Sequence, residues 1–144
     1  MDGIVRLGMM SRRMNVKIPK PKKQKDLTPR VDKLWSELVK IKAGYKCEYC
    51  GISTTLNSHH IFPIGNKATR WDLENGMCLC VSHHKFGKFS AHLSGMEFAE
   101  WVIEKRGIDW YTALRDRSRE IVKHSRESKM AIMEDLKARI KEEG

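Results

Sequence analysis

The feature of this chain that most constrains its fold is a set of cysteine and histidine pairs. Cys47 and Cys50 have two residues between them, and Cys80 and His83 repeat that spacing about thirty residues later. Three thiolates and one imidazole are a standard donor set for a closed, tetrahedral zinc site. The spacing therefore predicts one structural Zn²⁺ that ties two distant segments together. The alternative interpretation is buried cysteines without a ligand.

The remaining cysteine, Cys78, precedes Cys80 by two residues in a short apolar run. On a strand these two side chains would point to the same face. We expect Cys78 to be a buried thiol, with ligand exchange at the zinc site as the alternative.

Two histidine doublets accompany the zinc pairs. On a strand, His59 and His60 would point to opposite faces, so that one can bind a metal while the other approaches from another direction. On a helix after Cys80, His84 can face a second metal ion while His83 faces the zinc. A lone histidine is usually an ordinary core or surface residue. Two doublets joined to a zinc framework favour a second, catalytic metal site.

The charge of the chain indicates the class of its partner. The net charge is +10 and the pI about 9.6, which favours a polyanion, most commonly nucleic acid, although a basic surface that serves solubility is the alternative. No apolar run approaches the ~20 residues that span a bilayer, and the N-terminus has no apolar signal core. We expect a cytoplasmic protein with no membrane partner, in which thiols stay reduced.

Three segments are expected along the chain. Residues 1–26 form a basic tail that prolines keep extended, and it could lie along phosphates, serve as an address signal or be a solvated arm. Residues 27–92 hold a leading helix and the metal-binding module, and residues 93–144 form a helical extension. The lysines of the tail are Lys17, Lys20, Lys22, Lys23 and Lys25.

Local patterns predict an α+β module within residues 27–92. The leading helix has Thr28 as its cap, Pro29 in its first turn and Gly44 at its end. Short strands are expected over 55–63 and 77–79, with a polar loop over 65–72 between them. A helix should cover 80–88.

The helical extension has its own start and stop signals. Ser94 and Glu97 form a capping-box pattern, Gly107 ends that helix, and Asp109 caps the next one. An apolar stripe then continues to the end of the chain, with a break expected near 125–128. Such a stripe could build a homodimer or could cover the core of one subunit. Its members are Tyr111, Leu114, Ile121, Val122, Ile132, Met133, Leu136 and Ile140.

These motifs, taken in order, resemble the HNH endonucleases of the His-Me finger group, which have a ββα-metal fold. The resemblance covers about residues 45–92 and rests on the cysteine pair, His59-His60-Ile61, Asn75 and the run from Leu79 to His84. His83 occupies a zinc-ligand position that is usually a cysteine.

The resemblance implies a role for each matched residue. His59 and His84 are the catalytic-metal ligands, His60 is the general base, and Asn75 orients the loop that holds His60. Members with a third protein ligand often have a histidine one turn after the equivalent of His84, where this chain has a lysine, Lys88. His92 is a candidate substitute, and water with phosphate oxygens is the alternative.

The activity implied is metal-assisted hydrolysis of phosphodiester bonds in DNA. Imidazole ligands suit Mn²⁺, Ni²⁺, Co²⁺ or Zn²⁺, and Mg²⁺ is plausible because phosphate supplies oxygens. Cations near the site in sequence, together with the tail lysines, could hold the DNA backbone. They are Lys67, Arg70, Lys85 and Lys88.

A narrower resemblance links Arg70-Trp71-Asp72 and the C-terminal helices to phage and prophage recombination nucleases. It predicts a structure-selective nuclease, which could form a homodimer, in the cytoplasm of a bacterial or infected host cell. Two other classes remain as alternatives. One is a zinc-ribbon nucleic-acid-binding protein without catalysis, and the other is a zinc-stabilised module whose C-terminal helices bind a protein.

Overall fold

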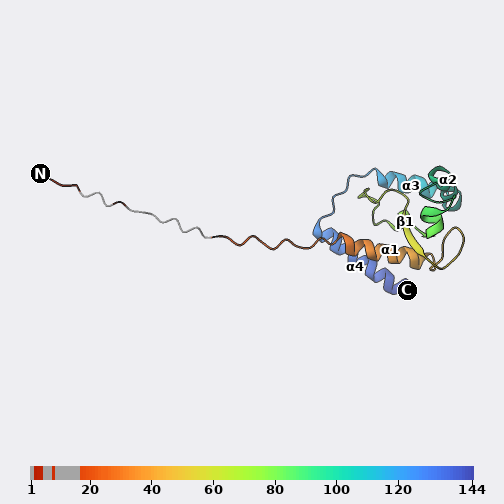
Figure 1. Cartoon of the computed structure of the whole chain (residues 1–144), viewed down its shortest axis with the longest axis horizontal. Coiled ribbons are helices and arrows are strands. Elements are labelled where there is room, and N and C mark those ends of the chain that lie inside the picture. The colour runs from red at the N-terminus through yellow and green to blue at the C-terminus, as the bar shows by residue number, and fades with distance from the viewer. Residues whose placement is uncertain (1, 5–7, 9–16) are drawn as a thin grey trace.

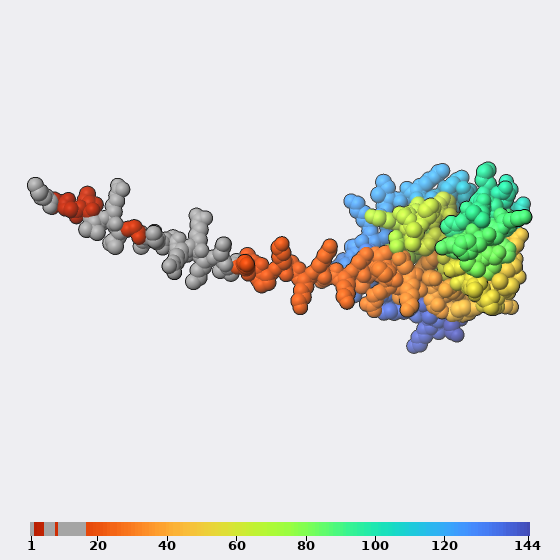
Figure 2. All heavy atoms as spheres, viewed as in Figure 1, coloured from red at the N-terminus to blue at the C-terminus, as the bar shows by residue number. Residues whose placement is uncertain are grey.

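The computed structural model of the chain describes residues 2–4, 8 and 17–144, and the other positions of the expected tail lie outside the described residues. Residues 17–26 are exposed, contain no helix or strand and lead away from the folded part (Figures 1 and 2). In the described part of the chain, no helix combines the length and the apolar character that crossing a bilayer requires.

The folded part combines helices with one small sheet, which confirms the α+β class and the expected order of strand, strand and short helix. Strands β1 and β2 are antiparallel, with Leu56 opposite Cys80 and His60 opposite Gly76. The elements in chain order are α1 (Thr28–Lys42), β1 (Leu56–His60), η1 (Leu73–Asn75), β2 (Gly76–Cys80), η2 (Ser82–Phe86), α2 (Gly95–Arg106), α3 (Ile108–Ser118) and α4 (Arg126–Glu143).

Helix α1 lies across one side of the sheet and contributes more buried residues to the first core than any other element. Its buried side chains are Val31, Trp35, Leu38 and Val39, which recur at helical spacing. Leu27, rather than the expected Thr28, occupies the position before the first helical residue. The Thr28 hydroxyl and amide instead donate to Asp26, at 2.9 and 3.0 Å.

Helix α4 packs along α1, so that the end of the chain covers this first core (Figure 1). Met133 and Leu136 are buried there, and Ile132 and Ile140 pack against the same cluster. The expected stripe is shorter than predicted, because α3 ends at Ser118 and Ile121 is 97% exposed in the segment that follows.

A second core lies between β2 and α2. Met77 and Leu79 of β2 are completely buried against Phe98 and Val102 of α2. The predicted capping box is wrong, because the Ser94 hydroxyl donates to the carbonyl of Ser90 at 3.0 Å and accepts from its amide at 2.9 Å. It makes no hydrogen bond to the free amides of the first turn of α2.

A network of polar contacts joins α1 to the loop between the strands. The Asp32 carboxylate accepts two hydrogen bonds from the Arg70 guanidinium, at 2.8 and 2.9 Å, and one from Trp71 Nε1 at 2.7 Å. Burial raises the pKa of Asp32, but these donors outweigh it, so the pKa lies below its usual value. The carboxylate therefore stabilises the fold in its charged form.

The pKa of Asp32 predicts how this network responds to acid. Because the pKa is depressed in the folded state, the contribution of Asp32 is fully present above its unfolded value, about 3.9, and declines as pH falls below it. We expect Asp32→Asn to lower the free energy of unfolding at pH 7 and to have progressively less effect towards pH 3. Denaturant titrations of both proteins at each pH measure this, with Asp135→Asn as a surface control. A constant difference between pH 7 and pH 3 would contradict it.

Candidate metal centres and active site

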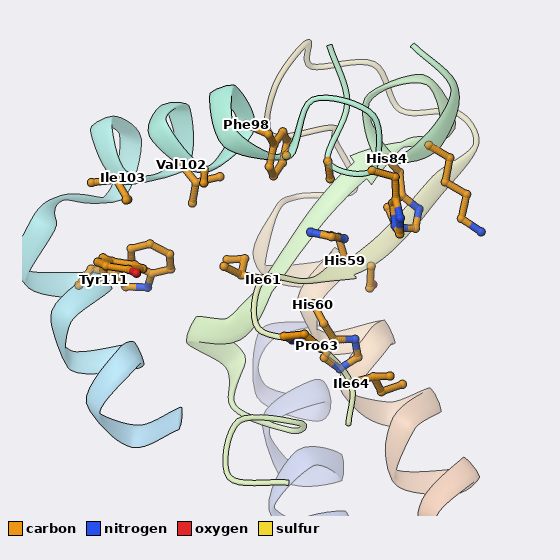
Figure 3. A pocket seen from close by; sticks show the side chains of 17 residues that line it. His59, His60, Ile61, Pro63, Ile64, His84, Phe98, Val102, Ile103 and Tyr111 are labelled. Atoms are coloured by element: carbon orange, nitrogen blue, oxygen red, sulfur yellow. The ribbon is translucent and has the colours of Figure 1, made fainter. Parts of the chain in front are cut away.

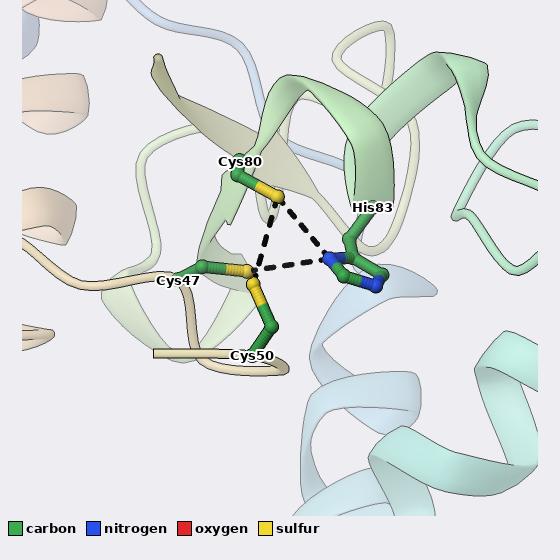
Figure 4. Close-up of side chains that lie close together, drawn as sticks. All are labelled: Cys47, Cys50, Cys80 and His83. Atoms are coloured by element: carbon green, nitrogen blue, oxygen red, sulfur yellow. Dashed lines mark hydrogen bonds between the residues drawn. The ribbon is translucent and has the colours of Figure 1, made fainter. Parts of the chain in front are cut away.

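The predicted zinc ligands come together at one end of the sheet (Figure 4). The Sγ atoms of Cys50 and Cys80 are 3.8 Å apart, and His83 Nδ1 lies 3.1 Å from Cys80 Sγ and 3.9 Å from Cys47 Sγ. Two sulfurs bound at about 2.3 Å to a tetrahedral zinc ion are themselves about 3.8 Å apart. The four donors therefore fit a Zn²⁺ ion, and the cluster can hold one.

The turn between Cys47 and Cys50 prepares a thiolate. Gly51 closes the turn with a φ of +78°, and its amide donates to the carbonyl of Cys47 at 2.8 Å. Burial raises the pKa of the Cys47 thiol, but amides of Cys50, Cys80 and Tyr49 aimed at the sulfur bring the pKa below its usual value. A lowered thiol pKa favours the deprotonated form that binds zinc.

Cys78 behaves differently, as expected of a buried thiol. It is completely buried in the first core against α1, and burial raises its pKa to about 11. Cys80, two residues later, belongs to the second core, so the two sulfurs lie in different surroundings. The strand pattern had predicted that both side chains point to the same face. The strand ends at Cys80, which lets its side chain depart from the alternation.

A second group of possible ligands is formed by three histidines, each of which comes from a different segment. One ring nitrogen from each of His59, His84 and His92 lies within 4.8 Å of the others. The Nε2 atoms of His84 and His92 are 3.2 Å apart, close to the separation of two imidazole nitrogens that share an ion at about 2.1 Å. His84 Nδ1 is buried without a hydrogen-bond partner among the described residues. The group has the donors and the spacing of a metal site.

Two of these histidines, His59 and His84, are held in the neutral form. Burial, followed by the proximity of the other histidines, lowers the pKa of His59 to about 3, and burial lowers that of His84 to about 4. Neutral imidazoles keep the lone pairs that a metal ion requires.

His60 points to the other side of β1, towards α1 (Figure 3). Its ring stacks on the indole of Trp35, with centroids 3.9 Å apart and planes 11° from parallel. Its Nε2 is 2.9 Å from the carbonyl oxygen of Arg70. A carbonyl can only accept, so Nε2 carries the hydrogen and Nδ1 keeps a free lone pair whenever the ring is neutral. Burial lowers the pKa of His60, which favours the neutral ring.

Asn75 clamps both ends of the loop that holds His60. The buried amide oxygen accepts from the amide of Phe62 at 2.6 Å, and Nδ2 donates to the carbonyls of Phe62 and Thr69 at 3.1 and 3.0 Å. Thr69 precedes Arg70, whose carbonyl fixes His60. Asn75 thus fixes, through the backbone, the loop whose carbonyl contacts His60.

The histidines line one cavity of about 700 Å³ (Figure 3). His59, His84 and His92 lie on its wall with His60 and Lys85, while the remainder of the lining is mostly apolar. Of the other predicted phosphate contacts, Lys67 and Lys88 are exposed, whereas the Arg70 guanidinium is held by Asp32.

Sequence reasoning missed Trp35, which lies outside the segment that resembles a known family. The residue is buried, stacks on His60 and donates from Nε1 to the carbonyl of Asp72 at 3.0 Å. Its helical spacing with Val31 and Leu38 indicated only a core position. No local pattern announced that a histidine from β1 would pack on it.

Residues 47–93 match the model of a known family, described as HNH endonuclease. The match spans both ligand clusters, and this stretch, about a third of the chain, is therefore similar to an HNH endonuclease module. Neither a curated protein nor a solved structure matches the chain. The narrower resemblance to phage recombination nucleases stays a prediction.

The zinc cluster makes a direct prediction about metal content. We expect purified protein to contain one zinc ion per chain, and Cys47→Ala to lose both the ion and cooperative unfolding, because so small a module depends on its metal. Cys78→Ala is the matched control and should keep its zinc. Elemental analysis and thermal unfolding measure the two effects. An intact fold without zinc would contradict the prediction.

Proposed function

We propose that the protein is a metal-dependent DNA endonuclease that hydrolyses phosphodiester bonds. The observation that carries this proposal is the convergence of His60 and the cluster of His59, His84 and His92 on one cavity of an HNH module. A zinc-ribbon protein without catalysis would need only the cysteine-containing cluster. It would have no use for the three histidines of the second cluster or for the positioned ring of His60.

His60 acts as the general base in this proposal. Its Nδ1 accepts a proton from the attacking water, and the resulting positive charge on the ring is supported by the Arg70 carbonyl that receives Nε2–H. Stacking on Trp35 fixes the plane of the ring, so that the lone pair keeps one direction. Asn75 is a positioning residue, since it acts through the loop.

His59, His84 and His92 would hold the catalytic ion. A divalent ion supplies positive charge that stabilises the negative charge accumulating on the phosphate. Imidazole donors suit Mn²⁺, Ni²⁺, Co²⁺ or Zn²⁺, and Mg²⁺ could bind with additional oxygen ligands. His92 takes the place of the third ligand that family members often have one turn after the second.

Lysines are the proposed contacts to the DNA backbone. Lys85 lies on the cavity wall, and Lys67 and Lys88 are exposed. The exposed lysines of residues 17–26 add to this set of basic side chains. In this proposal 27–92 is the nuclease module, 1–26 a DNA-binding tail and 93–144 a supporting extension. The apolar residues of α4 pack on α1 within one subunit, and a homodimer through the C-terminal helices stays a prediction.

The role of His60 is tested by substitution. We expect His60→Ala to reduce cleavage of supercoiled plasmid in Mn²⁺ by about 10²- to 10⁴-fold, the usual contribution of a general base, with DNA affinity nearly unchanged. His124→Ala, which removes a histidine outside the cavity, is the matched control. Cleavage is followed on gels and binding by fluorescence anisotropy. Cleavage by His60→Ala at the wild-type rate would remove His60 from this role.

The role of His92 is tested through metal binding. We expect His92→Ala to weaken Mn²⁺ binding at least about tenfold, because even residues that only support metal ligands contribute about 10- to 100-fold. Zinc content should not change, since the cysteine-containing cluster is separate. Lys88→Ala, at the position where family members often have the ligand, should bind Mn²⁺ like the wild type. Titration calorimetry of the zinc-loaded proteins measures the Mn²⁺ affinity. An unchanged affinity in His92→Ala would mean that water, and not His92, completes the ligand shell.

A further inference from the structure

The cavity that contains the histidines continues into an apolar half between β1, α2 and α3. Phe98, Ala99, Val102 and Ile103 line it from α2, and Trp110 and Tyr111 line it from α3. In Figure 3 the labelled side chains of α2 and Tyr111 face the space on the side of His59 that lies away from His84. One cavity thus joins a half lined by the three histidines and Lys85 to an aromatic half.

The two halves are in direct contact. The ring of His59 meets the edge of Phe98, with centroids 5.8 Å apart and planes at 87°. The ring of Tyr111 lies nearly parallel to that of Phe62, at 6.4 Å, and the Arg106 guanidinium lies 5.1 Å from the centroid of Trp110. The aromatic walls are therefore held in place from behind. Trp110 Nε1 is a buried donor without a partner among the described residues.

We propose that the apolar half of this cavity receives one unpaired nucleobase of the DNA strand whose phosphate lies at the three-histidine cluster. The inference rests on the proposed function and names its substrate class as single-stranded or locally unpaired DNA. A base attached to the nucleotide next to that phosphate is within reach of the adjoining half. Aromatic walls accept any base by stacking, because every base has a π-face.

The chemistry of the whole cavity favours a nucleotide over an apolar peptide. Lys85 and the histidine cluster call for an anion at one end, while the aromatic end calls for a flat apolar group. A cavity of about 700 Å³ is also in the range of small-molecule sites, about 300–1,000 Å³. A paired base is retained in the duplex stack, so it could enter only after unpairing, which costs free energy.

Cleavage of single-stranded oligonucleotides tests the inference bond by bond. Two end-labelled strands of the same sequence are compared, one intact and one with a single abasic nucleotide, in Mn²⁺. We expect the bond beside the abasic position to be cut about 5- to 100-fold more slowly than in the intact strand, the range that corresponds to stacking one base on aromatic side chains. Distant bonds in the same strand are the internal reference. The intact strand should also be cut faster than its duplex.

Filling the cavity should remove this dependence. Ala99 is exposed on α2 and lines the cavity, so Ala99→Phe should slow cleavage of the intact strand. The two strands should then be cut at the same rate at the abasic position. Ala113→Phe makes the same change at an exposed position of α3 outside the lining and should behave as the wild type. Tyr111→Ala, which removes an aromatic wall, is a second variant. The difference in cleavage rate between the intact and the abasic strand should be smaller for it. Circular dichroism verifies each fold.

The outcomes separate the inference from the proposed function. If the wild type cuts the bond beside the abasic nucleotide as fast as in the intact strand, the base pocket is overturned. Equal cleavage rates for Ala99→Phe and Ala113→Phe also overturn it. Neither result contradicts the proposed nuclease activity. Failure of the wild type to cut any DNA overturns the proposed function. In that case a bound 2-aminopurine oligonucleotide decides the inference, since its fluorescence should be quenched by the wild type and not by Ala99→Phe. Equal quenching by both proteins overturns it.

Discussion

Adjacent residues on a strand face opposite sides, and this constraint on His59 and His60 organises the rest of the molecule. One side of β1 directs His59 to His84, His92 and α2, while the other directs His60 to Trp35 on α1. Among residues 17–144 the sheet has two strands, so helices must cover both of its faces to bury them. Each face consequently has its own core and one of the two adjacent histidines. The loop between the strands then brings the Arg70 carbonyl back to His60, so both sides meet at one cavity.

The three-histidine cluster and the cysteine-containing cluster place different demands on the fold. The cysteine-containing cluster joins the turn at 47–51 to the end of β2 and the start of η2, and its amides favour a thiolate. In the histidine cluster, burial and the proximity of other histidines lower the pKa of His59 and His84 and keep their rings unprotonated. Because none of the three ligands in this cluster carries a negative charge, a bound divalent ion would keep its full attraction for a phosphate. His83 and His84 are adjacent in the chain, so the position of one cluster restricts that of the other.

Sequence spacing was sufficient to predict the features that depend on short segments. The cysteine pairs, the strand alternation at His59-His60 and the turn of η2 are local, so the cysteine-containing cluster and the proximity of His59 to His84 follow from them. The contribution of His92 stayed open, because η2 ends at Phe86 and irregular backbone separates it from α2. The stacking of Trp35 on His60 and the pairing of Asp32 with Arg70 join segments more than twenty residues apart. Such contacts depend on how α1 docks, which no local pattern contains.

The docking of α1 depends in turn on a residue without a side chain. A methyl group at Gly76 would overlap Val39 and meet Trp35, so only glycine permits α1 to approach the start of β2 this closely. Gly76 pairs with His60 across the sheet, which places the Trp35 indole beside the imidazole. A larger residue at 76 would separate α1 from the sheet and release the ring of His60 while both ligand clusters remained complete. The position of the proposed base is therefore a property of the interface between α1 and the HNH module, although Trp35 and Asp32 lie outside the matched segment.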